Sequence, residues 1–132
     1  MPEYDLAGRV IGCAMKVHTT LGPGFLESVY QNALALEIRR IGLTVELERP
    51  LQVSYEGQAV GRFLVDMLVE QELVVENKAV QTLNKAHEVQ LVNYLTAIRV
   101  EHGLLLNFGA ESLQFRKKFR TYRPSPTKAD SL

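Results

Sequence analysis

Apolar residues recur every three or four positions along the first part of the chain, which is the spacing of one buried helix face. The apolar positions are Leu6, Val10, Cys13, Val17 and Leu21. The segment Gly22-Pro23-Gly24 follows, and such a run of glycine and proline stops a helix. The pattern therefore predicts an amphipathic helix that begins near Leu6 and ends at Leu21.

A second helical stripe follows the Gly22-Pro23-Gly24 segment. Its buried positions are Tyr30, Leu34, Ile38 and Ile41. Arg39 and Arg40 then provide a basic last turn, and Gly42 provides the glycine that helix C-termini favour. We therefore expect this second helix to end just before Gly42.

The hydrophobic period changes after Gly42. From Leu43 to about Val80, β-branched and aromatic residues occur in short runs, with turn signals at Arg49-Pro50 and Glu56-Gly57-Gln58. This pattern predicts three or four strands, at about 43–48, 51–55, 59–69 and 73–80. The last two strands should form an antiparallel hairpin across Glu70-Gln71-Glu72.

The final third of the chain predicts one helix and two strands. Asn84 can cap a helix over about 85–102 that Gly103 would end, followed by a buried strand at 103–108. A last strand at 113–120 would place Phe115, Lys117 and Phe119 on one face and Arg116, Lys118 and Arg120 on the other.

The predicted order of elements along the whole chain is ααββββαββ, which indicates an α/β sandwich with a central mixed sheet flanked by helices. We expect one domain over residues 1–123 and a disordered polar tail over 124–132.

Composition agrees with a single globular domain. The chain has 132 residues, of which 46% are hydrophobic and 23% are charged. Its one cysteine, Cys13, excludes an intramolecular disulfide and a multi-cysteine metal site, and we expect it to be buried. No basic-apolar leader is evident and no apolar run approaches a membrane span, so a cytoplasmic protein without a membrane partner is the expectation.

The formal net charge is zero, from 15 basic and 15 acidic residues, so no global field attracts nucleic acid. The distribution of charge is uneven, however. Five basic residues and no acidic residue lie between Arg116 and Arg123. Of these, Arg116, Lys118 and Arg120 form a candidate clamp for a phosphate backbone.

The predicted hairpin brings two acids together. With Gln71 at the centre of the turn, paired residue numbers sum to 142, which sets Asp66 opposite Glu76. Lys78 would lie on the same face, opposite Leu64. Opposed side chains have Cβ atoms about 5 Å apart, so the two carboxylates would repel each other. Mg²⁺ would relieve the repulsion, because it prefers a few carboxylate oxygens together with water and phosphate oxygens.

A solvent-exposed hairpin with surface ion pairs, worth about 0–1 kcal/mol each, is the alternative interpretation. Both strands are apolar on both faces, however, which indicates a central, covered position in the sheet. Charges inside such strands require partners. The apolar residues are Val65, Leu68, Val69, Leu73, Val74, Val75, Ala79 and Val80.

The helices carry further candidates, each with a simpler explanation beside it. Glu27 lies in the first turn of the second helix, where the helix dipole favours a carboxylate whatever the function. Tyr30 would share its face. His87, Gln90 and Tyr94 form a stripe on the third helix that is either boundary packing or a set of contacts to phosphate and to metal-bound carboxylates. The three histidines lack zinc spacing, and no aromatic stacking platform is evident.

Several blocks of this chain resemble the GxxExxY protein family. The segment Gly24-Phe25-Leu26-Glu27-Ser28-Val29-Tyr30 matches the signature that names the family, and Leu21-Gly22-Pro23 before it is also typical. The resemblance continues in the family's order over roughly residues 5–120. The further blocks are Val65-Asp66-Met67-Leu68-Val69, Val75-Glu76-Asn77-Lys78-Ala79, His87-Glu88-Val89-Gln90-Leu91-Val92-Asn93-Tyr94-Leu95 and Gly103-Leu104-Leu105-Leu106-Asn107-Phe108.

That family is placed in the PD-(D/E)XK nuclease superfamily, so the resemblance implies a restriction-endonuclease-like fold and a set of site residues. Asp66 looks like the motif aspartate, Glu76 and Lys78 like the (D/E)XK pair, and Glu27 like an extra helical acid. Gln90 and Tyr94 resemble a QxxxY element. Val65 stands where the superfamily name expects proline.

The resemblance also implies an activity and a cofactor. Asp66, Glu76, the backbone carbonyl of Asn77 and Glu27 would hold Mg²⁺ or Mn²⁺, and Lys78 would act on the attacking water. Tyr30, His87, Gln90 and Tyr94 would contact the phosphate or the metal-binding carboxylates. The expected function is hydrolysis of nucleic acid, with DNA favoured over RNA. A nuclease-fold module that binds nucleic acid or a protein without turnover is the alternative, and a homodimer is an open expectation.

Overall fold

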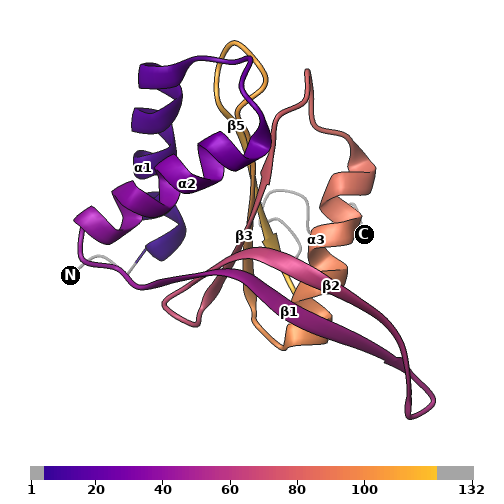
Figure 1. The fold of residues 1–132 in the computed structure, drawn as a ribbon. Coiled ribbons are helices and arrows are strands. Elements are labelled where there is room, and N and C mark those ends of the chain that lie inside the picture. Colours follow the sequence, from indigo (N-terminus) through magenta and orange to yellow (C-terminus); the bar gives the residue numbers. More distant parts are fainter. Residues whose placement is uncertain (1–4, 122–132) are drawn as a thin grey trace, which may run out of the picture.

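The computed structural model describes residues 5–121, which form three helices and one five-stranded sheet (Figure 1). The elements in chain order are α1 (Leu6–Leu21), α2 (Glu27–Arg40), β1 (Val45–Tyr55), β2 (Gln58–Val69), β3 (Leu73–Lys78), α3 (Lys85–Ile98), β4 (His102–Asn107) and β5 (Gln114–Phe119). The predicted tail at 124–132 and the end of the predicted domain at 123 lie outside the described residues.

The sheet is mixed, as the sequence predicts. Its strand order is β1-β2-β3-β4-β5, and the β3–β4 pair is parallel while the other three pairs are antiparallel. Helix α3 connects the two parallel strands, which require such a crossover. The α/β fold class is therefore confirmed.

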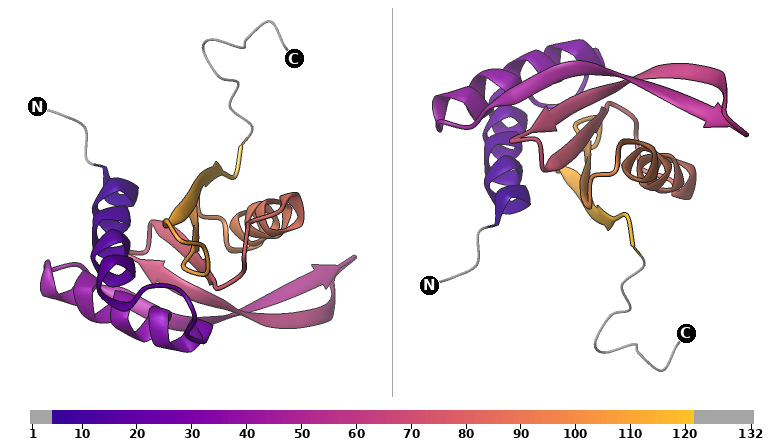
Figure 2. Two further views of the ribbon diagram at one scale, coloured as in Figure 1. Left: turned by 90° about the horizontal axis from the view of Figure 1, so that it is seen from above. Right: turned by 90° about the horizontal axis from the view of Figure 1, so that it is seen from below.

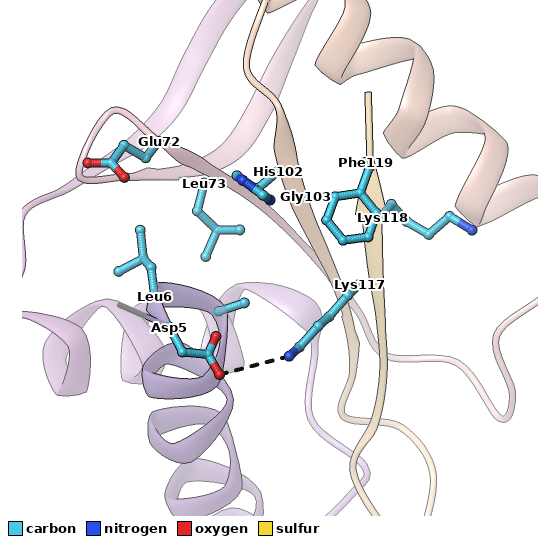
Figure 3. A pocket seen from close by; sticks show the side chains of 10 residues that line it. Asp5, Leu6, Glu72, Leu73, His102, Gly103, Lys117, Lys118 and Phe119 are labelled. Carbon is cyan, nitrogen blue, oxygen red and sulfur yellow. Dashed lines mark ion pairs between the residues drawn. The ribbon is translucent and has the colours of Figure 1, made fainter. Parts of the chain in front are cut away.

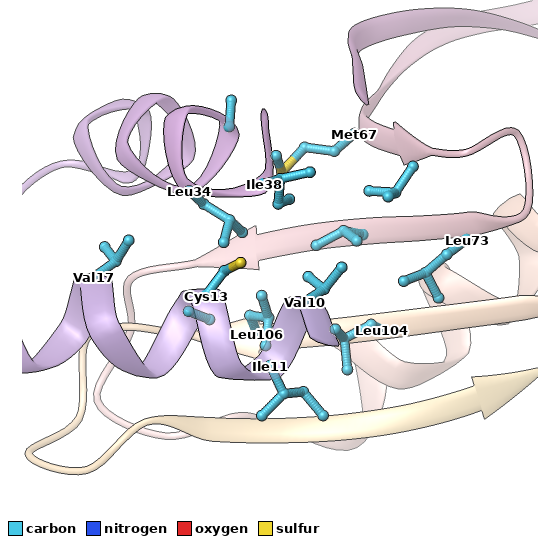
Figure 4. Close-up of a cluster of buried hydrophobic side chains, with 14 of the residues drawn as sticks. Val10, Ile11, Cys13, Val17, Leu34, Ile38, Met67, Leu73, Leu104 and Leu106 are labelled. Carbon is cyan, nitrogen blue, oxygen red and sulfur yellow. The ribbon is translucent and has the colours of Figure 1, made fainter. Parts of the chain in front are cut away.

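Helices cover both faces of the sheet (Figure 2). Helices α1 and α2 pack on one face, where Val10, Leu34 and Met67 belong to the larger hydrophobic cluster shown in Figure 4. Helix α3 packs on the other face through Leu91 and Leu95. Strand β3 lies between these layers, and its first five residues are buried. The prediction of a central, covered strand is confirmed for β3, whereas only the second half of β2 is covered.

The first two helices match the sequence-based expectation. Helix α1 begins after Asp5, whose side chain accepts a hydrogen bond from the backbone N–H of Gly8, and it ends at Leu21. Helix α2 ends just before Gly42, where the chain adopts a φ of 87°. Cys13 is buried, as expected. Among the described residues, no helix is long and apolar enough to cross a membrane.

The prediction of two strands at 43–48 and 51–55 is wrong. One strand, β1, runs through Arg49-Pro50, so the order is ααβββαββ. Pro50 pairs with Leu64 without ending the strand. Strand β1 is at the edge of the sheet, where the N–H that proline lacks is not needed by a further strand.

The predicted boundary of the third helix is also wrong. Helix α3 ends at Ile98 rather than near residue 102, because Arg99 adopts a left-handed conformation with a φ of 63°. The N–H groups of Arg99 and Val100 both bond to the carbonyl of Leu95, which terminates the helix. Gly103 is therefore not a helix stop. It lies within β4.

Gly103 has a packing role that leads to a testable prediction. A Cβ atom at this position would lie 3.0 Å from a side-chain carbon of Leu95 and 3.1 Å from one of Leu91. We therefore expect Gly103→Ala to destabilise the protein by about 1–3 kcal/mol in urea unfolding, because α3 must move away from β4. Gly12→Ala is the control, because an added Cβ on α1 meets none of the described neighbours within 4 Å. That change should be stabilising by about 0.5–1 kcal/mol, and equal effects of the two substitutions would contradict the prediction.

Candidate active site

The two central acids lie where β2 and β3 separate. The hairpin turns at Glu70–Glu72 as predicted, and its pairs are Met67 with Val75, Leu68 with Val74 and Val69 with Leu73. This register is the one that the sequence predicts. The paired segment of β2 and β3 ends at Met67 and Val75, immediately before Asp66 and Glu76.

The position of Lys78 differs from the prediction. We expected Lys78 to lie opposite Leu64, but β2 and β3 are already separate at that level. Lys78 instead pairs with Asn107 of the parallel strand β4, and its carbonyl accepts a hydrogen bond from the N–H of Phe108.

Beyond the paired segment, the carboxylates of Asp66 and Glu76 connect β2 and β3 through side-chain hydrogen bonds to the backbone of the opposite strand. Oδ2 of Asp66 accepts from the N–H of Asn77, and Oε2 of Glu76 accepts from the N–H of Asp66, each at 2.8 Å. Each acid is therefore held by the opposite strand. The second oxygen of each carboxylate accepts no hydrogen bond from residues 5–121 and remains available to a ligand.

Strand β2 changes sides at Asp66. Val65 and Met67 are two positions apart and would share a face in a regular strand. In the structure, Val65 packs into the cluster under α3, whereas Met67 packs into the cluster under α1 and α2. On the neighbouring strand, Glu48 has a φ of 52° between Leu47 and Arg49, which pair with Met67 and Val65. The irregularity therefore affects both strands at the level of Asp66.

Burial makes the charge of these acids unfavourable. Glu76 is only 5% exposed, and burial, together with the charge of Asp66, raises its pKa to about 8. Burial is also the main cause that raises the pKa of Asp66, and the charges of Glu27 and Glu48 act in the same direction. The charge of Lys78 opposes the shift at both acids. Lys78 is thus close enough to act on the same ligand.

Glu27 is positioned by a buried tyrosine. The hydroxyl group of Tyr30 donates to the carbonyl of Gly22 at 2.5 Å and accepts from the N–H of Phe25 at 3.1 Å, which fixes the segment before Glu27. The Tyr30 ring is completely buried and stacks on Phe108 at 4.8 Å. The burial of Tyr30 and the two hydrogen bonds of its hydroxyl group do not favour the direct phosphate contact that we expected as one alternative. Tyr30 instead fixes the segment that leads into Glu27.

The predicted stripe on α3 divides into two parts. His87 takes part in the helix cap, in which its Nδ1 accepts from the N–H of Asn84 and its own N–H donates to the Asn84 side chain. Gln90 and Tyr94 instead line a groove beside the sheet. Burial raises the pKa of Tyr94, as do the charges of Glu76 and Asp66. Tyr94 thus lies near the acids, whereas His87 has a structural role in the cap.

The three basic residues of the candidate clamp face acidic partners. Nζ of Lys118 lies 3.0 Å from Glu88 of α3, and Nε of Arg116 lies 3.9 Å from the same carboxylate. Nε of Arg120 lies 3.9 Å from Glu101. A phosphate would have to compete with these ion pairs, so the clamp stays a prediction that the ion pairs do not favour.

Three residues that contribute to the site were not predicted. Glu48 places a further negative charge near Asp66. Asn107 is fully buried, and its side chain bonds to both the N–H and the carbonyl of Val80 at 2.9 Å, which holds the chain just after Lys78. Phe63 stacks on Tyr94 with ring centroids 4.3 Å apart. Only Glu48 had a signal in the sequence, as an acid within an otherwise strand-like segment.

The candidate ligand atoms of this site are oxygens, the type of atom that binds a hard divalent cation. Carboxylate and carbonyl oxygens are the ligands that Mg²⁺ and Mn²⁺ prefer. The pKa of Asp66 and the pKa of Glu76 are both raised, and a nearby cation would favour the ionised form of each acid. Within residues 5–121, no group of three His, Cys, Asp or Glu side chains is arranged to hold an ion.

A second cavity lies at the other end of β3 and takes no part in this site. It has a volume of about 210 Å³ and lies between the beginnings of α1, β3 and β4 and the end of β5 (Figure 3). Asp5 and Lys117 form an ion pair of 4.0 Å in its wall. Leu73 lines this cavity at the first residue of β3, whereas Lys78 is the last residue of that strand.

The comparisons with known proteins agree with this geometry. A family model described as the PD-(D/E)XK nuclease superfamily matches residues 4–120. Searches of curated proteins and of solved structures gave no match. The match covers nearly the whole described chain and includes all four predicted site acids and bases, Glu27, Asp66, Glu76 and Lys78.

Proposed function

Because the chain belongs to the PD-(D/E)XK nuclease superfamily, we propose that it is a metal-dependent nuclease that hydrolyses phosphodiester bonds at the Asp66–Glu76–Lys78 site. One observation carries the proposal. A buried glutamate and a partly buried aspartate each accept a hydrogen bond of 2.8 Å from the backbone of the other's strand, and the charge of a nearby lysine acts on both. Ionising both acids at this position is costly unless a cation compensates their charge.

The residues have separate roles in this proposal. Asp66, Glu76 and the carbonyl of Asn77 would bind Mg²⁺ or Mn²⁺, with Glu27 reaching the ion through water. The bound ion would polarise a phosphoryl oxygen and lower the pKa of a water molecule. The ammonium group of Lys78 would orient the attacking water and balance the charge of the scissile phosphate. Lys78 can do so because it forms no ion pair within residues 5–121.

The direct test is cleavage of nucleic acid by the purified chain. We expect cleavage in the presence of Mg²⁺ or Mn²⁺ and none in the presence of EDTA. Labelled single-stranded DNA, duplex DNA and RNA should be compared, because DNA as the preferred substrate is part of the proposal. Absence of metal-dependent cleavage for all three substrates would refute the nuclease assignment.

A binding module without turnover is the second candidate. It is favoured by one observation, that the described residues contain no ready-made group of three metal-ligating side chains. Calorimetric titration with Mn²⁺ separates the two functions, with Asp66→Asn as the variant. Loss of Mn²⁺ binding in the variant supports the enzyme. Nucleic-acid binding that needs no metal and no Asp66 supports the module.

A homodimer remains a proposal as well. The exposed edge of β1 is not suited to pairing with a second copy, because it contains Pro50 and the positive-φ residue Glu48. A dimer would therefore use another surface. Light scattering across a range of concentrations would show whether the chain associates.

A further inference from the structure

A groove runs between α3 and the projecting part of the β1–β2 ribbon, with a volume of about 810 Å³. Figures 1 and 2 show this ribbon extending past the rest of the sheet beside α3. Phe63 lies on the ribbon side, and Val89, Gln90, Asn93 and Tyr94 lie on the helix side. The helical positions recur at three- and four-residue spacing, so they form one continuous wall.

Aromatic rings form the inner part of the groove. Phe63 and Tyr94 stack on each other at 4.3 Å with an interplanar angle of 25°, and both are only partly buried. Each ring uses one face for this contact, and both rings also pack against the buried cluster under α3 and line the groove. Aromatic surfaces of this kind bind nucleic-acid bases of any sequence by stacking. The sequence alone gave no sign of this platform, because 31 positions separate the two residues.

The polar groups of the groove suit a nucleotide chain. Gln90 and Asn93 are exposed and each offers amide donors and an acceptor. Lys85 is a charged residue of the lining, and no acidic side chain of residues 5–121 lines the groove. This local charge differs from the chain as a whole, which has equal numbers of acids and bases. A polyanion would therefore meet less repulsion here than over most of the surface.

Tyr94 relates the groove to the candidate active site. Tyr94 belongs to the groove lining, and the charges of Glu76 and Asp66 act on its phenol. A strand lying on Phe63 and Tyr94 would therefore have a neighbouring phosphate close to the two carboxylates. A stacked duplex has no free base faces along its length for these rings. An unpaired strand has them.

We propose that this groove binds a single-stranded segment of nucleic acid, with bases packed on Phe63 and Tyr94 and the backbone directed toward Asp66 and Glu76. The inference rests on the proposed nuclease function and assigns its substrate class as unpaired strands or strand ends. Recognition is independent of base sequence, because stacking surfaces rather than a fixed set of base-edge contacts dominate the lining.

The test uses a fluorescent reporter inside the groove. The chain contains no tryptophan, so Phe63→Trp introduces a single indole that keeps the aromatic surface. Its fluorescence is measured in EDTA, which prevents cleavage, during titration with an oligonucleotide of about 12 nucleotides and with the blunt duplex of the same sequence. Tyr55→Trp is the control reporter, because Tyr55 is 65% exposed at the end of β1 and does not line the groove.

We expect the single strand to quench the indole fluorescence of Phe63→Trp and to leave the control reporter unchanged, whereas the duplex quenches neither.

A second pair of variants tests the groove surface itself. Val89→Glu adds a negative charge to the groove, which should repel the phosphate backbone of a single strand. We expect binding to weaken by about tenfold or more, which is the size of effect that the loss of one stacked base would have. Leu36→Glu is the matched control on α2, since both side chains are 50% exposed. This control should bind as the parent protein does.

The results separate this inference from the nuclease proposal. Quenching by single strands without cleavage of any substrate would support the groove and refute the nuclease. Cleavage of blunt duplex without quenching would support the nuclease and overturn the groove. Equal quenching by strand and duplex, or equal effects of Val89→Glu and Leu36→Glu, would also overturn the groove.

Discussion

Lys78→Ala is expected to lower the rate of metal-dependent cleavage by about 10²–10⁴-fold, the range observed when a group that assists proton transfer is removed. The ammonium group lies near Asp66 and Glu76, and its positive charge opposes the rise in the pKa of both acids. Alanine cannot orient a water molecule or balance the charge of a phosphate. Single-turnover cleavage of a labelled oligonucleotide with saturating Mn²⁺ measures the effect.

Two controls keep this result specific to Lys78. Lys117→Ala removes a lysine from β5 of the same sheet, where it pairs with Asp5, and should leave the rate unchanged. Mn²⁺ binding by Lys78→Ala should be retained or slightly tightened, because the substitution removes a positive charge and no ligand. If Lys78→Ala cleaves as fast as Lys117→Ala, the lysine has no role in the chemistry.

Glu76→Gln is expected to stabilise the metal-free protein at pH 8 by several kcal/mol. In the folded protein the pKa of Glu76 is raised to about 8, mainly by burial and then by the charge of Asp66. In the unfolded chain the same carboxyl has a pKa of about 4.3. Each unit of difference corresponds to about 1.4 kcal/mol, so the full effect is on the order of 3–5 kcal/mol.

The direction of the pH dependence follows from proton binding. Between about pH 4.3 and pH 8, folded Glu76 keeps a proton that the unfolded chain has released. Stability must therefore decrease as the pH rises through this window, and the loss is complete above the folded pKa. The glutamine variant has no such proton, so its stability should stay higher at the alkaline end.

Urea unfolding at a series of pH values in EDTA measures this difference. Mn²⁺ should restore stability to the wild type at pH 8 and have little effect on Glu76→Gln, because one ligand is lost. Glu56→Gln makes the same chemical change in the exposed turn between β1 and β2 and should follow the wild-type profile. Parallel pH profiles for wild type and Glu76→Gln would show that Glu76 ionises normally.

The sequence predicted the elements whose residues act locally. The 3-and-4 spacing from Leu6 to Leu21 predicted α1 with the observed ends, and the symmetric turn around Gln71 predicted the register of β2 and β3. Both depend on neighbours that are close in the chain. The position of Asp66 beside Glu76 followed from that register.

The errors arose where distant packing determines the outcome. Pro50 is tolerated within β1 only because the strand is at the edge of the sheet, and Gly103 lies in β4 because Leu91 and Leu95 of α3 pass close to it. Lys78 could not be placed correctly, because β2 and β3 stop pairing at Met67 and Val75, whereas β3 stays paired with the distant strand β4 up to Lys78. The stacking of Phe63 on Tyr94 likewise joins segments that no local pattern relates.

The change of sides at Asp66 divides the β1–β2 ribbon into two independent parts. The part that includes Met67 is fixed by the layer of α1 and α2, whereas the outer part, with Val65 and Phe63, faces α3. Removing or adding one residue in a strand turns every following side chain to the other face, whereas a change of two residues per strand preserves the pattern. Homologous or engineered chains can therefore lengthen or shorten the outer arm in such paired steps, and so alter how far it reaches, while the two acids keep their places.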